Sequence, residues 1–108
     1  MVAYPSITQV ELVKVAQLIA EATPVDRIIL FGSRAKGASQ VDSDVDLAVV
    51  LPEGADLRAG VKTIHRALWP RPFPVDVVPI SASDWRTRQS QLIREIADTG
   101  ITLYPHAG

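Results

Sequence analysis

Three short apolar runs constrain the fold more than any other feature of the sequence. They cover residues 27–31, 45–51 and 75–80, and polar or turn-forming residues bound each of them. Apolar runs of about four to eight residues with such boundaries are typical of buried strands, whereas helices are usually longer. The sequence therefore predicts at least three strands, which must pair in one small sheet.

Helical patterns lie between and around these runs. We expect helices over about residues 7–22, 56–68 and 83–99, because apolar side chains recur there at helical intervals. The expected inward-facing residues are Leu12, Val15, Ala16 and Ile19 in the first helix, Leu57, Val61, Ile64 and Leu68 in the second, and Leu92, Ile93 and Ile96 in the third. Gly100 suits the C′ position of the last helix, and residues 101–104 predict a short final strand. This order predicts an α/β (α+β) domain, a small mixed sheet flanked by helices.

Composition limits the classes of function. At 108 residues the chain suits one domain, residues 1–108, with a single core. It has no cysteine, which excludes disulfides and thiolate metal sites and makes the cytoplasm the expected location. No apolar run reaches the roughly 18 residues that span a bilayer, and the N-terminus has no secretory pattern. A net charge of −1 gives no reason to expect nucleic acid or a membrane as the main partner.

Acidic residues interrupt two of the predicted strands. Asp46 lies in the run at 45–51, and Asp76 lies in the run at 75–80. A buried carboxylate without a partner is costly, so these positions must meet water, a cation or an arginine. Asp44 and Asp46 project from the same face because strand side chains alternate, and Asp76 on a neighbouring strand would add a third carboxylate.

A cluster of carboxylates without histidine or cysteine is a hard-oxygen site, which suits Mg²⁺ or Mn²⁺. Such a cluster can hold the two ions that phosphoryl-transfer enzymes use. The alternative is a set of surface aspartates at strand ends, paired with Arg27 or Arg71.

Gly32 and Ser33 stand where the first strand ends and a polar stretch begins. Glycine lets the backbone approach a ligand closely, and the amides of a strand-to-helix turn form a concavity for phosphate. Ser33 adds a hydroxyl donor, while Arg34 and Lys36 add positive charge. Alone, the pair would be read as a tight turn; with the later acids it predicts a nucleotide-phosphate site.

The combined pattern resembles a known family. Gly32 and Ser33, followed after ten residues by Asp44, Val45 and Asp46, are similar to the signature of the DNA polymerase beta-like nucleotidyltransferase superfamily. The longer stretches 30–37 and 43–47 resemble its minimal nucleotidyltransferase (MNT) branch, and residues 92–96 and 100–104 resemble the closing helix and strand of that branch. The resemblance covers nearly the whole chain and implies the nucleotidyltransferase fold.

The resemblance also implies roles for individual residues. Asp44 and Asp46 would ligate two Mg²⁺ ions, and Asp76 would be the third carboxylate, which binds the second ion and helps to deprotonate the acceptor. Gly32 and Ser33 would hold the phosphates of ATP, with Arg34 as a further phosphate contact.

MntA-like antitoxins of this size act in modules with a helical HEPN-type toxin ribonuclease. The resemblance thus implies an antitoxin that transfers AMP from ATP to a tyrosine of its toxin partner, with which it would form a hetero-oligomer. Two alternatives stay open: a binding module that neutralises its partner by contact alone, and a small-molecule nucleotidyltransferase. Larger relatives modify aminoglycosides or regulatory proteins with an additional helical domain, which we do not expect in this chain.

Aromatic residues around the prolines at 70, 72 and 74 allow two interpretations. Trp69 and Phe73 are expected to cover the edge of the core. If they are exposed, they could instead anchor a partner.

Overall fold

The structure is a computed structural model of the chain, and it describes residues 9–32, 45–70 and 74–105. Its elements are α1 (Gln9–Ala22), β1 (Arg27–Phe31), β2 (Val45–Leu51), α2 (Leu57–Ala67), β3 (Val75–Ser81), α3 (Ala82–Thr87), α4 (Gln91–Thr99) and β4 (Ile101–Tyr104). All four predicted strands are confirmed. The third extends one residue further than predicted, to Ser81.

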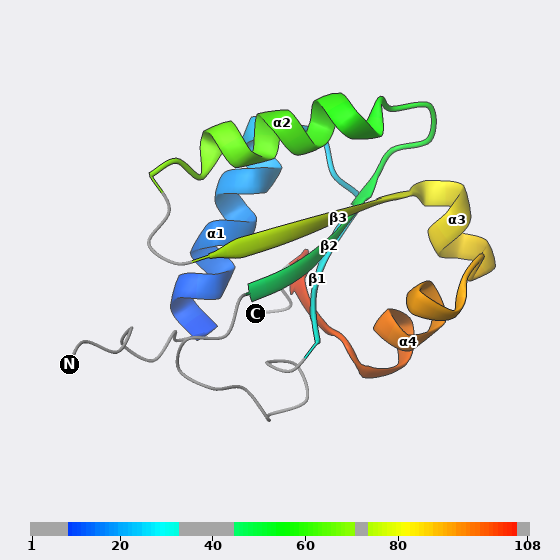
Figure 1. Cartoon of the computed structure of the whole chain (residues 1–108). Helices are drawn as coiled ribbons and strands as arrows, with labels where there is room; N and C mark the ends of the chain where they lie inside the picture. Colours follow the sequence, from blue (N-terminus) through cyan, green and yellow to red (C-terminus); the bar gives the residue numbers. More distant parts are fainter. Residues whose placement is uncertain (1–8, 33–44, 71–73, 106–108) are drawn as a thin grey trace.

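The four strands form one mixed sheet in the order β3-β2-β1-β4. β2 and β3 run parallel, while β1 is antiparallel to both β2 and β4. A parallel pair needs a long crossover connection, and α2 provides it between β2 and β3 (Figure 1). The predicted fold class, a small mixed sheet flanked by helices, is confirmed.

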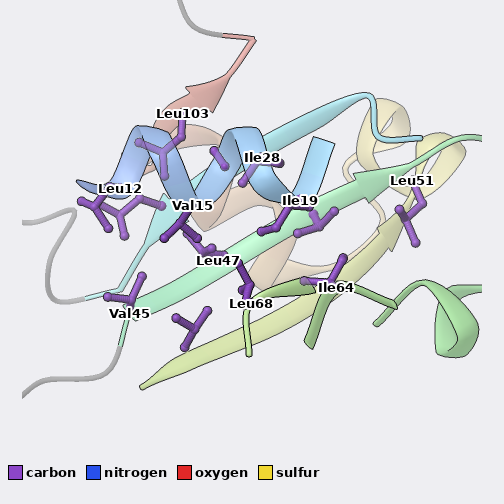
Figure 2. Close-up of a cluster of buried hydrophobic side chains, with 14 residues drawn as sticks. Leu12, Val15, Ile19, Ile28, Val45, Leu47, Leu51, Ile64, Leu68 and Leu103 are labelled. Atoms are coloured by element: carbon purple, nitrogen blue, oxygen red, sulfur yellow. The ribbon is translucent and has the colours of Figure 1, made fainter. Parts of the chain in front are cut away.

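The larger part of the core lies between one face of the sheet and the helices α1 and α2 (Figure 2). The helical spacing in α1 is confirmed, since Leu12, Val15, Ala16 and Ile19 are all buried. In α2, Ile64 and Leu68 are buried, and Leu57 and Val61 are partly buried. From β2 this face receives Val45, Leu47, Val49 and Leu51. The odd-numbered side chains of β2 therefore point toward α1 and α2.

The opposite face of the sheet packs against α3 and α4. Here the prediction of one helix over 83–99 is wrong, because two short helices replace it. Arg88 adopts a left-handed conformation (φ 55°) at the end of α3. Ser90 then caps α4, and its Oγ accepts a hydrogen bond of 3.1 Å from the backbone N–H of Ile93. A capped start two residues after a left-handed residue breaks the helix.

Two expectations about α4 are also corrected. Ile93 and Ile96 are buried as predicted, but Leu92 is 45% exposed. Consecutive helix residues point about 100° apart, so Leu92 lies beside the buried stripe and not within it. Gly100 is the C-cap with extended backbone (φ −74°) rather than a left-handed C′ residue. It is required for space, because a Cβ there would collide with Cγ2 of Ile29.

Trp69, which follows the C-cap of α2, departs from its expected place. Trp69 is 73% exposed, so the prediction that it covers the edge of the core is wrong. Its C-capping neighbour Leu68 fills the core position in its place. Phe73 lies outside the described residues. None of the helices described is long and apolar enough to cross a membrane.

Candidate active site

Asp46 and Asp76 lie side by side on adjacent parallel strands. They are register partners in the pairing of β2 with β3. On its other side Asp46 pairs with Phe31, the last residue of β1. Paired residues in neighbouring strands are about 4.8 Å apart and point to the same face. Asp76, Asp46 and Phe31 therefore form one row across the sheet.

This row lies on the face of the sheet that α3 and α4 cover only in part. Asp46 and Asp76 point to the same side as Ala48, Val50 and Ile80, which pack against the two helices. The acids, however, stand near the start of β2 and β3, whereas α3 follows the far end of β3 (Figure 1). Consistent with that position, Asp46 is half-buried and Asp76 is exposed. Solvent and a ligand can reach the acid pair.

Gly32 borders the site at the end of β1. Its φ of +80° is a conformation that residues with a Cβ rarely adopt. A Cβ placed on Gly32 would lie 2.5 Å from Oδ2 of Asp46, well inside normal contact distance. The glycine thus allows the Asp46 carboxylate to lie directly against the backbone at the end of β1. Both the backbone conformation and the close approach require glycine here.

Three of the predicted site residues, Ser33, Arg34 and Asp44, lie outside the described residues. Of the predicted set, the structure brings together Gly32, Asp46 and Asp76. The alternative pairing of Asp46 with Arg27 is wrong. Arg27 is at the opposite end of β1, where it pairs with Val50 and its Nη1 donates to Oγ1 of Thr102 over 3.4 Å. Arg71, the other arginine considered, is also outside the described residues.

A cavity of about 160 Å³ adjoins the row at its β1 end. It is lined by Phe31 and Gly32 from the sheet side and by Leu92, Glu95, Ile96 and Thr99 from α4. Sequence reasoning missed these α4 residues as neighbours of the site. They are more than 50 positions from Gly32, and only the return of the chain across β1 brings them near it. No local pattern could have identified them.

The family model for the nucleotidyltransferase domain matches residues 12–99. The match runs from α1 to the end of α4 and includes the whole row of Asp76, Asp46 and Phe31. The chain belongs to the nucleotidyltransferase domain family. No curated protein sequence matches it significantly.

Solved structures share the fold of this nucleotidyltransferase domain. A toxin–antitoxin crystal structure with AMP-PNP matches with a TM-score of 0.65 and 24% identity, over 87% of this chain and 73% of that chain. The toxin–antitoxin MntA–HepT matches with a TM-score of 0.62 and 22% identity, over 90% of this chain and 72% of that chain. A provisionally assigned nucleotidyltransferase from Sulfolobus solfataricus matches with a TM-score of 0.59 and 18% identity, over 87% and 80%.

Nucleotidyltransferases use a nucleoside triphosphate and a divalent metal ion, and the donor set of this site fits such an ion. Asp46 and Asp76 offer carboxylate oxygens from adjacent strands on one face, and carboxylates are the protein ligands that Mg²⁺ prefers. Within the described residues no three His, Cys, Asp or Glu side chains form a metal-binding group. The third expected ligand, Asp44, is outside that part of the chain.

Proposed function

We propose that this nucleotidyltransferase domain transfers AMP from ATP to the hydroxyl group of a tyrosine on a partner protein. The observation that carries the proposal is the register of Asp46 with Asp76 on an open face, with Gly32 against the Asp46 carboxylate. Carboxylate oxygens on one face of the sheet are the ligand type that Mg²⁺ prefers. A Mg²⁺–nucleotide complex bound by the pair would lie where a protein acceptor can reach it.

The proposed reaction is an in-line displacement. The acceptor hydroxyl oxygen attacks the α-phosphorus of ATP, the bond to the bridging oxygen of pyrophosphate breaks, and the hydroxyl proton is released. Asp44, Asp46 and Asp76 would hold two Mg²⁺ ions, which supply charge neutralisation at the attacking and leaving oxygens. Asp76, which is exposed on the edge strand β3, would accept the proton of the acceptor hydroxyl. Positioning and charge stabilisation account for most of the catalysis.

Three further roles rest on the resemblance to the MNT branch. Gly32 and Ser33 would bind the ATP phosphates through backbone amides and the serine hydroxyl. Arg34 would add a cationic contact to the same phosphates. Asp44 would share the metal ions with Asp46.

The proposed acceptor is a helical HEPN-type toxin ribonuclease, and AMP transfer to it would make this chain an antitoxin. The fold is shared with two toxin–antitoxin structures, one of which contains AMP-PNP. The exposed position of Asp76 on the outer strand β3 leaves it accessible to a macromolecular acceptor.

The direct test is incubation of the purified chain with α-labelled ATP, Mg²⁺ and soluble proteins of the source cell. We expect one labelled protein band, carrying AMP on tyrosine by mass spectrometry. Asp46→Asn should abolish the label while circular dichroism shows an intact fold. Labelling that persists in a doubly substituted Asp46→Asn, Asp76→Asn protein would contradict the proposal.

A second function, neutralisation of the partner by contact alone, is favoured by the exposed surface at Trp69. That side chain is 73% exposed and, with Leu18 and Pro70, lines a hollow of about 290 Å³ between α1 and the end of α2. Large exposed aromatic residues commonly mark protein interfaces. A partner that is neutralised by the Asp46→Asn protein without carrying AMP would establish this second function.

A further inference from the structure

The cavity beside Gly32 adjoins the proposed metal–nucleotide site. Phe31 is both the third member of the row with Asp46 and Asp76 and a wall of the cavity. One strand spacing, about 4.8 Å, separates it from Asp46. A ligand whose α-phosphate lies at the acids can therefore reach the cavity through a short linking group.

The cavity lies on the donor side of the site and not on the acceptor side. The acceptor is proposed to approach over β3, the outer strand that carries Asp76. The cavity is on the other side of Asp46, between the end of β1 and α4. On this side of Asp46, α4 lies over the face of β1.

The lining of the cavity combines an apolar slot with hydrogen-bond acceptors. Phe31, Leu92 and Ile96 present apolar surface, and Leu92 is 45% exposed although it is a large apolar residue. The Glu95 carboxylate has several lone pairs and can accept more than one hydrogen bond. Thr99 donates its hydroxyl proton to the Glu95 carbonyl over 2.9 Å, which leaves its oxygen as an acceptor.

An apolar cavity edged by hydrogen-bond acceptors is complementary to a nucleobase that carries an exocyclic amino group. We propose that this cavity binds the base of the donor nucleotide, with an aminopurine ring against Phe31 and Leu92 and its amino group toward Glu95. This inference rests on the proposed function and extends it: α4 selects the nucleotide. A purine with a carbonyl at the same position would direct oxygen lone pairs at the Glu95 carboxylate, and would be disfavoured.

The first experiment fills the cavity. Leu92→Trp places an indole in the slot, and Leu18→Trp makes the same change at a leucine of α1 that is equally exposed, at 47%. Binding of ATP and of inorganic tripolyphosphate is measured by calorimetry with Mg²⁺. Since contact with one base accounts for about a tenfold effect or more, we expect Leu92→Trp to weaken ATP about tenfold and to leave tripolyphosphate unchanged. Leu18→Trp should alter neither.

Unchanged ATP binding by a folded Leu92→Trp protein would overturn the inference. So would an equal loss of tripolyphosphate, because that ligand has no base.

The second experiment changes the polar edge of the cavity. Glu95→Gln replaces an acceptor-only carboxylate with an amide that also donates. We expect the preference for ATP over GTP to fall, because the amide can donate to the guanine carbonyl. An unchanged ATP/GTP ratio would overturn the assignment of Glu95.

Failure of this inference is distinguishable from failure of the proposed function. A wild-type chain that transfers AMP while the Leu92 and Glu95 variants retain its nucleotide preference would refute only the base site. A wild-type chain that binds neither ATP nor tripolyphosphate would refute both.

Discussion

Replacement of Gly32 by alanine tests the close approach between the end of β1 and the Asp46 carboxylate. The new Cβ would lie 2.5 Å from Oδ2 of Asp46, about 0.9 Å inside the 3.4 Å at which ordinary contact begins. Either the carboxylate or the strand end must move by that distance. Misplacement of a reacting group by about 1 Å can lower a rate about 100-fold, so we expect AMP transfer to fall by about that factor.

The same substitution also has a conformational cost. A residue with a Cβ in the left-handed region is about 1–2 kcal/mol less stable, and each kcal/mol lowers the Tm of a domain of this size by about 4–8 °C. Gly54→Ala is the matched control. Gly54 has a φ of +85°, similar to the +80° of Gly32, but nothing lies within 4 Å of its added Cβ.

The two alanine variants are compared by thermal unfolding and by transfer of label from α-labelled ATP. We expect similar losses of Tm, with the loss of transfer confined to Gly32→Ala. Equal transfer rates in both variants, measured well below their Tm, would refute the reasoning that Gly32 is required for the position of Asp46.

Three further substitutions distinguish residues required for AMP transfer from residues required for the stability of the fold. Asp76→Asn should lower AMP transfer about 100-fold or more, which is the scale for loss of one group that stabilises transition-state charge, and unchanged kinetics would contradict the role of this acid. The same substitution removes a like-charge pair and should raise the free energy of unfolding by about 0.2–1 kcal/mol. Leu47→Ala, at a fully buried position on the other face of the sheet, should cost about 2–5 kcal/mol in urea unfolding and leave transfer by the folded protein intact. Gly100→Ala should cost about 1–3 kcal/mol, since its Cβ would collide with Ile29 and lie 2.5 Å from the Ile96 carbonyl oxygen; an unchanged Tm would refute the packing argument.

The strands could be predicted from the sequence because each is a short apolar run with clear ends. Periodicity likewise identified α1, whose four predicted inward residues are all buried. The break between α3 and α4 could not be predicted. It depends on Arg88 in a left-handed conformation, which glycine or asparagine usually adopts. The local sequence therefore does not predict the break.

The acid pair was only half predictable. Two acids in apolar strands indicated a site, yet their adjacency depends on a parallel pairing of β2 with β3 in one particular register. A shift of one residue would point the acids to opposite faces. The α4 side of the site could not be found at all, because contacts such as that of Glu95 with the cavity beside Gly32 arise only from the folded path of the chain.

The most direct test of nucleotidyl transfer compares ATP labelled on the α-phosphate with ATP labelled on the γ-phosphate. Each is incubated with the chain, Mg²⁺ and the partner protein, and the label on the partner is counted. Attack at the α-phosphorus should transfer the α label and release the γ label as pyrophosphate, and Asp46→Asn should transfer neither. Transfer of the γ label, or equal α labelling by the Asp46→Asn protein, would contradict nucleotidyl transfer at the acid pair.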